Sequence, residues 1–448
     1  MNSYKKRLHD IIPGGAHTYS RGDDQFPSNA PSILVKGEGA YVFSPDGNSF
    51  LDYGMGLRSV NIGYANREIA DASYEEIMKG NNLTRASLTE LESAELLASL
   101  IPSVEMVKFA KHGSTVTTAA VKLARAYTGR KFIAIPHEQP FFSFDDWFIG
   151  STVMNLGALD EASDFTLKFN YNNIDTLKEL FEKYPGQICA VMLEAATTLR
   201  PCLNNCKNSL LCQNCENNSV NFLHQVKDLA HKNGTIFILD EMITGFRWHL
   251  NGAQTFYNIE PDLCTFGKAM ANGFAVAALG GKKEIMKLGG ILDEGKERIF
   301  LTSTTHGAEM SALGAFKKTV EILKREKVIE HFWNYGEKLT SEVNKISAKL
   351  GIQDYFYIEG YPCSPNYVTK DKFGINSLEM RTLFSQEMIN NGVLMPYIAI
   401  SNSHQEAELL KTLQAIEASL IVYANALNRN IDNYLKSPII KPVFRKFN

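Results

Sequence analysis

The chain has 448 residues, enough for one large α/β domain with smaller partners or for two to three domains. Hydrophobic residues make up 44% of it and charged residues 21%, with a formal net charge of -3. This composition is ordinary for a soluble globular protein and gives no sign of nucleic-acid binding. No apolar run is long enough to cross a bilayer, and the polar start lacks the apolar core of a signal peptide. We therefore expect a cytoplasmic protein with neither nucleic acid nor membrane as a partner.

The first 60 residues are rich in turns and form an N-terminal segment. Two short strands are expected at Ala40–Phe43 and Ser49–Tyr53, because the turn Pro45-Asp46-Gly47 joins them. Helical periodicity begins near residue 68, and Leu88–Leu100 has the spacing of an amphipathic helix that ends near Pro102.

The middle of the chain, residues 61–318, alternates apolar runs with helical patterns. Strands of a parallel sheet with helices on both faces are typical of that alternation. Ligands of such sheets bind beyond the carboxyl ends of the strands. The expected strands are Lys131–Ile135, Ile188–Leu193 and Thr235–Leu239, and the expected helices are Thr117–Tyr127, Ile174–Tyr184 and Val220–Asn233.

Residues 319–448 are predicted to form a separate C-terminal domain. A charged, amphipathic helical stretch, Val320–Leu350, is followed by a mixed segment and two more helices. The expected strands are Asp354–Glu359 and Tyr367–Thr369, and the helices are Leu378–Asn390 and His404–Leu427.

Three features of the sequence could carry chemistry. Asp240 closes the strand Thr235–Leu239, where a buried carboxylate needs a partner, and Lys268 follows another apolar stretch. The run His112-Gly113-Ser114-Thr115 opens a helix and offers backbone N–H groups and hydroxyls to a phosphate. Pyridoxal phosphate requires a lysine for its aldehyde, a carboxylate for its ring nitrogen and donors for its phosphate. Each feature alone is more often structural, so the set must be judged together.

The set resembles the class III, fold-type I pyridoxal-phosphate-dependent aminotransferases, nearest to the glutamate-1-semialdehyde 2,1-aminomutase group. The resemblance implies a large, mostly parallel sheet domain with helices on both faces. It also implies a smaller α+β domain built from the C-terminus and the N-terminal segment. The stretches that carry it are Pro13-Gly14-Gly15, Leu123–Arg130, Leu239–Arg247, Pro261-Asp262-Leu263, Phe266-Gly267-Lys268 and Thr304–Gly307.

The same resemblance assigns the cofactor residues. Lys268 would hold the cofactor as a Schiff base and move the reacting proton, and Asp240 would keep the ring nitrogen protonated. Gly113 and Ser114 would bind the phosphate. Thr304 would complete the phosphate site of a partner subunit, which implies a homodimer with shared active sites.

Three further residues receive roles on the same basis. Phe141 stands where the family carries the ring-stacking tyrosine, and a phenylalanine stacks without donating a hydrogen bond. Arg21 aligns with the arginine that holds the substrate carboxylate, although a guanidinium could also bind a phosphate or form a surface ion pair. Glu194 matches a position near the cofactor, whereas Ala195 replaces the family's usual proline.

Three hypotheses about function follow. The leading one is an aminotransferase that moves an amino group from an amino acid to a small aldehyde, ketone or keto-sugar. An intramolecular aminomutase is second, because the stretch 150–160 is too short for the long gating loop that would retain its intermediate. The third is a non-catalytic, metal-stabilised scaffold, which the retention of both Asp240 and Lys268 disfavours. No dinucleotide fingerprint of the Gly-x-Gly-x-x-Gly type follows an early strand.

A cysteine-rich insertion lies at residues 199–218. Four thiols this close can surround one tetrahedral ion, as in structural zinc sites and iron–sulfur clusters. Free thiols or disulfides remain alternatives, and a cytoplasmic location disfavours disulfides. The four candidate ligands are Cys202, Cys206, Cys212 and Cys215.

Overall fold

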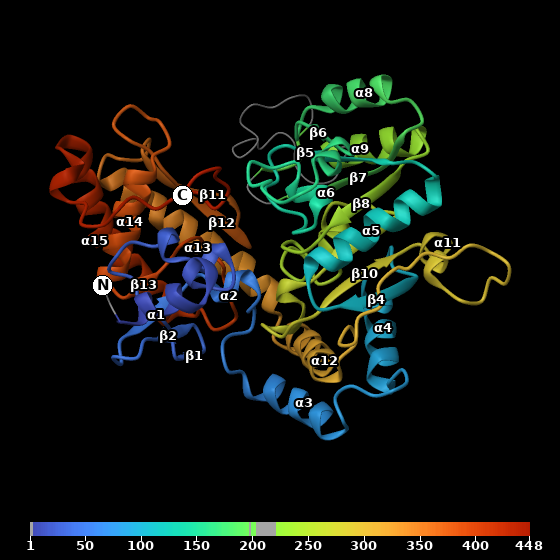
Figure 1. Cartoon of the computed structure of the whole chain (residues 1–448). Helices are drawn as coiled ribbons and strands as arrows, with labels where there is room; N and C mark the ends of the chain where they lie inside the picture. Colours follow the sequence, from blue (N-terminus) through green and yellow to red (C-terminus); the bar gives the residue numbers. More distant parts are fainter. Residues whose placement is uncertain (1–2, 197–198, 203–220) are drawn as a thin grey trace. The chain divides into compact units, whose positions relative to one another are not determined.

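The computed structural model describes residues 3–196, 199–202 and 221–448 (Figure 1). The chain folds into two compact units. One comprises Met1–Asn66 with Glu330–Arg445, and the other comprises Arg67–Ile329 with Lys446–Asn448. Among the described residues, no helix combines the length and the apolar character that crossing a membrane demands.

The unit of Arg67–Ile329 is built on a seven-stranded sheet. Its order is β4-β10-β9-β8-β7-β5-β6, in which β10 runs antiparallel to both neighbours and the pairs from β9 to β6 are parallel. The strands are β4 (Met106–Ala110), β5 (Phe132–Pro136), β6 (Thr166–Phe169), β7 (Ile188–Glu194), β8 (Ile236–Asp240), β9 (Leu263–Phe266) and β10 (Ala277–Gly281).

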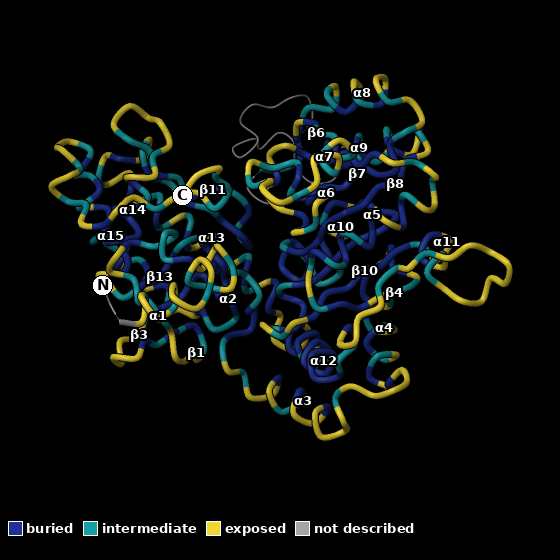
Figure 2. The backbone as a smooth tube through the Cα atoms, in the orientation of Figure 1, coloured by how far each residue is buried: buried dark blue, intermediate teal, exposed yellow. Residues whose placement is uncertain are grey.

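The central strands are buried throughout, which explains why they are apolar runs with no polar alternation (Figure 2). Helix α5 packs across β4, β10, β9, β8 and β7, while α9 packs on β7 and β8. The helices of this unit are α3 (Arg67–Met78), α4 (Leu88–Leu100), α5 (Gly113–Thr128), α6 (Asp146–Ile149), α7 (Asp160–Asp164), α8 (Ile174–Lys183), α9 (Phe222–Lys232), α10 (Gly252–Phe256), α11 (Lys283–Met286) and α12 (Met310–Arg325).

The other unit joins the N-terminal segment to the C-terminal part of the chain. Strand β13 pairs in parallel with β3, so residues far apart in sequence share the sheet β1-β2-β3-β13. The strands of this unit are β1 (Lys36–Glu38), β2 (Tyr41–Phe43), β3 (Ser49–Asp52), β11 (Phe356–Tyr361), β12 (Ser364–Thr369) and β13 (Val393–Leu394). Its helices are α1 (Ser3–Ile11), α2 (Met55–Arg58), α13 (Val328–Lys349), α14 (Leu378–Asn390) and α15 (Glu406–Asn428).

The short α2 is a strained left-handed turn. All four residues from Met55 to Arg58 have positive φ, between 40° and 66°, a region that disfavours side chains other than glycine. The buried Asp52 carboxylate holds the turn, because it accepts the N–H groups of Gly54 (2.7 Å) and Met55 (3.0 Å). The Tyr64 hydroxyl donates to the same carboxylate at 2.7 Å.

The fold class expected from the sequence is confirmed, including the small domain shared by both chain ends. Two details differ from expectation. The stretch 320–350 is two helices, because Lys327 adopts a φ of 50° between α12 and α13. Strands β4, β6, β9 and β10 were not recognised: β4 and β6 each contain a lysine, β10 is built mainly of alanine and glycine, and β9 has only four residues.

A second buried carboxylate, Glu241, fastens the connection after β8. It accepts the backbone N–H groups of Ala253 (2.5 Å) and Gln254 (3.2 Å) and the side-chain amide of Gln254 (3.0 Å). A Cβ at Gly252 would lie 2.7 Å from a carboxylate oxygen, so only glycine permits this approach. Burial raises the pKa of Glu241 to about 7, and the hydrogen bonds from Gln254 and Ala253 oppose that rise.

The protonation of Glu241 predicts a pH-dependent stability. Its pKa is about 7 when folded, against an ordinary value of 4.5, so the folded chain retains a proton that the unfolded chain loses. That stabilisation is complete below pH 4.5 and is lost as pH rises to about 7, on the order of 3 kcal/mol. As the pH rises through this window, the free energy of unfolding measured with denaturant should therefore fall in the wild type relative to Glu241→Gln. The exposed Glu260→Gln is the control, and equal pH profiles for all three proteins would contradict the assignment.

Candidate active site

Asp240 lies at the carboxyl end of β8, in register with Glu194 on β7 and Thr265 on β9. It is buried and accepts hydrogen bonds from the Thr265 hydroxyl (2.9 Å) and the Met242 backbone N–H (3.0 Å). Among the described residues, both bonds fall on Oδ1, which leaves Oδ2 as an acceptor for a ligand. Burial raises the pKa of Asp240, while the Met242 N–H, the nearby Lys268 ammonium and the Thr265 hydroxyl oppose the rise.

Lys268 follows the adjacent strand β9 and begins the short helix Lys268–Ala271. Its φ of 42° lies in the left-handed region, a conformation that costs a non-glycine residue about 1–3 kcal/mol. Such strain persists only where surrounding packing enforces it. The strain and the charge interaction with Asp240 together make Lys268 a candidate functional lysine.

The N-terminus of α5 lies at the same edge of the sheet. Strand β4 pairs with β10 from Met106↔Gly281 to Ala110↔Ala277, and β10 pairs with β9 up to Phe266. The carboxyl end of β4 therefore shares the edge with the ends of β8 and β9. Gly113 and the buried Ser114 open this 16-residue helix there, so its first N–H groups and one hydroxyl are groups that could bind an anion.

Met242 packs between the two loops that flank this edge. A Cβ at Gly113 would lie 2.9 Å from the Met242 Sδ, and a Cβ at Gly267 would lie 2.6 Å from it. Both glycines therefore allow their loops to approach the same sulfur. The helix N-terminus, the Asp240 loop and the Lys268 loop meet at this side chain.

Phe141 lies in the segment that leaves β5 at this edge. Its side chain is 45% exposed, and its ring contacts Phe148 edge-on with centroids 5.8 Å apart. The neighbouring Phe142 is buried against the same Phe148. Phe141 therefore presents a ring that a planar ligand could cover, and its stacking role stays a prediction.

Glu194 ends β7 beside Asp240 and is buried. Its backbone N–H donates to Gln139 Oε1 at 2.8 Å, and its carbonyl accepts from Gln139 Nε2 at 2.9 Å. Neither Gln139 nor Thr265 was recognised in the sequence. Thr265 reaches Asp240 through the register of two strands, and Gln139 bonds the backbone of Glu194. Neither contact produces a motif that can be recognised in the sequence.

Thr304 is exposed on a loop that passes the end of β4. Gly307 on this loop would place a Cβ 3.3 Å from the Phe109 carbonyl oxygen, so the loop lies against the strand. The Lys111–Glu309 ion pair (2.7 Å) fixes its far end. Side-chain bonds from Lys111 and Ser311 hold the pKa of Glu309 down to about 2, despite partial burial.

Arg21 and the clustered cysteines are the remaining expected site residues. Arg21 is exposed and belongs to the other compact unit. Of the four clustered cysteines, Cys206, Cys212 and Cys215 lie outside the described residues. Within the residues that the structure does describe, no group of three or more His, Cys, Asp or Glu side chains is arranged to hold a metal.

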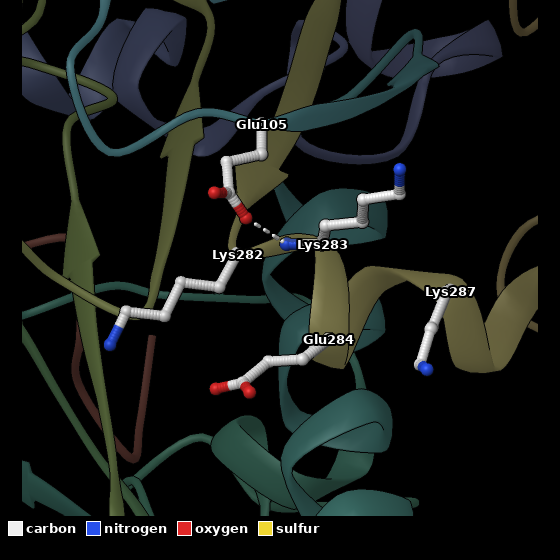
Figure 3. Close-up of a pocket in the computed structure, with 5 residues that line it drawn as sticks. All are labelled: Glu105, Lys282, Lys283, Glu284 and Lys287. Carbon is white, nitrogen blue, oxygen red and sulfur yellow. Dashed lines mark hydrogen bonds between the residues drawn. The ribbon is translucent and has the colours of Figure 1, made fainter.

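A cavity of about 500 Å³ lies away from this edge (Figure 3). It is lined by Glu105, Lys282, Lys283, Glu284 and Lys287, and the Lys283 N–H donates to Glu105 at 2.6 Å. Glu105 precedes β4 and Lys282 follows β10, so this cavity is at the amino ends of the parallel strands. It is therefore separate from the site at the carboxyl ends.

The residues at the carboxyl edge fit pyridoxal phosphate. The cofactor requires an amine for its aldehyde, an acceptor for its ring N–H and donors for its phosphate. The strained lysine, the buried carboxylate with one oxygen left as an acceptor, and the helix N-terminus with its hydroxyl are groups of these three kinds. The crowding of Gly113 and Gly267 on Met242 shows that the phosphate and lysine loops converge.

Two similar proteins cover most of the length of this chain. The 3-aminobutyryl-CoA aminotransferase of Cloacimonas acidaminovorans is 31% identical over 423 residues, covering 92% of this chain and 94% of that protein. A glutamate-1-semialdehyde 2,1-aminomutase of Syntrophomonas wolfei is 31% identical over 435 residues, with 92% and 96% covered.

Solved structures share the fold. The FumI protein of Sphingopyxis sp. MTA144, solved in a PLP internal aldimine form, superposes with a TM-score of 0.81 at 21% identity over 98% of both chains. An omega-transaminase from Sphaerobacter thermophilus gives 0.79 at 21% identity, covering 94% and 97%. The family model described as Aminotransferase class-III matches residues 24–199 and 214–355. The chain therefore belongs to the class-III aminotransferases and is a pyridoxal-phosphate-dependent enzyme of that family.

Proposed function

We propose that this enzyme transfers an amino group from an amino acid to a small aldehyde, ketone or keto-sugar, with Lys268 and Asp240 as its catalytic residues. The observation that carries the proposal is the placement of both residues at the carboxyl ends of neighbouring strands, with the Lys268 charge acting on the Asp240 carboxylate. When bound, pyridoxal phosphate supplies a carbonyl that takes up amino groups and a ring that accepts electrons.

Each residue then has a defined task. Lys268 Nζ would hold the cofactor and would move a proton from and to the reacting carbon. The Asp240 carboxylate would keep the ring nitrogen protonated. Gly113 and Ser114 would bind the phosphate, Phe141 would stack on the ring, and Glu194 would lie near the cofactor.

The proposal extends to assembly and substrate binding. Thr304 is exposed, as expected of a residue that completes the phosphate site of a second copy in a homodimer. Arg21, also exposed, is proposed to bind the substrate carboxylate, for which a planar guanidinium is suited.

Asp240→Asn tests the catalytic assignment. The variant should still bind the cofactor but should transfer the amino group of an added donor about 100-fold more slowly or worse, because an amide cannot balance a protonated ring. Single-turnover loss of the visible cofactor band measures that rate. Asp262→Asn is the matched control, since Asp262 is also buried but pairs with His231 and Lys282 at the opposite edge. Equal rates in both variants would contradict the role of Asp240.

An intramolecular aminomutase is the second candidate, favoured by the similarity to the enzyme of Syntrophomonas wolfei. It predicts turnover of a single amino aldehyde with no added donor. The connection from β5 to β6 contains the short helices α6 and α7, and residues 150–159 between them leave little length for a gating loop. Two-substrate transfer is therefore preferred, and product formation from one substrate alone would reverse that preference.

The cysteine cluster is proposed as a structural zinc or iron–sulfur site on the spacing of its thiols. Cys202, its described member, is buried, and its backbone N–H donates to Asn172 Oδ1 at 2.8 Å, which anchors the start of the insertion.

Metal analysis of anaerobically purified protein tests this site. We expect about one bound zinc, or iron with sulfide, per chain, retained in Cys189→Ala and lost when Cys212 and Cys215 are both changed to serine. Metal-free wild-type protein would refute the proposal without affecting the assignment of Lys268.

A further inference from the structure

The segment from Gln139 to Trp147 crosses the carboxyl edge of the sheet between β5 and α6. It contains Phe141, whose stacking role rests on the proposed function. The segment has no strand or helix of its own before α6, so its course depends on side-chain contacts at its two ends.

One end is held by the Gln139 amide. Strand β5 ends at Pro136, whereas its partner β7 continues to Glu194. The Gln139 side chain supplies the missing ladder partner: Oε1 accepts the Glu194 N–H at 2.8 Å and Nε2 donates to the Glu194 carbonyl at 2.9 Å. Both residues are buried, so each of these backbone groups would be costly to leave unpaired.

The other end is held by the first turns of α5. The Thr117 hydroxyl donates to the Phe142 carbonyl at 2.8 Å, and the Phe144 N–H donates to Ser114 Oγ at 3.1 Å. Thr118 bonds the Asp145 carboxylate and accepts from Trp147 Nε1 at 2.8 Å. The phosphate-site helix and the end of β7 therefore both anchor the segment.

We propose that Gln139 is a positioning residue of the cofactor site, which sets the placement of Phe141 through its two bonds to Glu194. Pro140 lies between the two residues and restricts the backbone, so fixing Gln139 also fixes the direction in which Phe141 leaves it. Only an amide provides the required acceptor and donor together, because a carboxylate lacks the N–H and an apolar side chain lacks both.

The test compares Gln139→Leu with Gln386→Leu in the holoenzyme. Gln386 is a buried glutamine of the other unit whose side chain also makes two hydrogen bonds to the backbone. It accepts from the Lys436 N–H (2.7 Å) and donates to the Tyr434 carbonyl (3.1 Å). Both variants should lose thermal stability. Only Gln139→Leu should raise the Kd for pyridoxal phosphate, by about tenfold, and alter the induced circular dichroism of the cofactor band.

Thr117→Val keeps the β-branched shape and loses the bond to Phe142, so it should change the same dichroism to a smaller extent. It carries the test if Gln139→Leu fails to fold. The inference would be overturned if Gln139→Leu and Thr117→Val both showed the wild-type Kd and dichroism. If Gln139→Leu cannot be obtained, wild-type values in Thr117→Val alone would overturn it. The proposed function would instead be refuted if the wild-type protein showed no cofactor band that the loss of Lys268 removes. Failure of the inference and failure of the proposed function are therefore distinguishable.

Discussion

The site depends on the burial of one carboxylate, Asp240, at the end of a central strand. An ionised carboxylate in such a place is costly unless hydrogen bonds and an opposite charge compensate it. The Thr265 hydroxyl and the Met242 N–H supply the bonds, and Lys268 supplies the charge. Each of these partners lies on the strand next to β8 or in a turn beside it. The order of the strands therefore brings together the groups that compensate the buried carboxylate.

The connecting loops are also closely packed at this edge, which lies at the carboxyl ends of the parallel strands. Glycines at 113 and 267 let two loops close on Met242, and the Gln139 amide continues the β7 ladder after β5 has ended. The left-handed Lys268 is the strained element within this packing. The strands therefore position Asp240 and Lys268, the proposed catalytic pair, and side-chain bonds position the segments that would surround a cofactor.

Sequence alone predicted what periodicity and motif order encode. The apolar runs that became β7 and β8 and the helix that became α5 were recognised, as were Asp240 at the end of a strand and Lys268 after an apolar stretch. Strands β9 and β10 were not, because β9 has only four residues and β10 is built mainly of alanine and glycine, which are poor strand formers. Thr265 and Gln139 were missed for a different reason. Their contacts depend on the register of β8 with β9 and on where β5 stops, and neither is visible before the chain is folded.

The central claim is that Lys268 carries the cofactor, and chemical trapping tests it most directly. Borohydride reduction of the purified holoprotein, followed by peptide mass spectrometry, should place the cofactor mass on the peptide that contains Lys268. Lys111 is the instructive alternative, because it also follows a strand at this edge but is already paired with Glu309 at 2.7 Å. A label on Lys111 or on any other lysine, with Lys268 unmodified, would contradict the account.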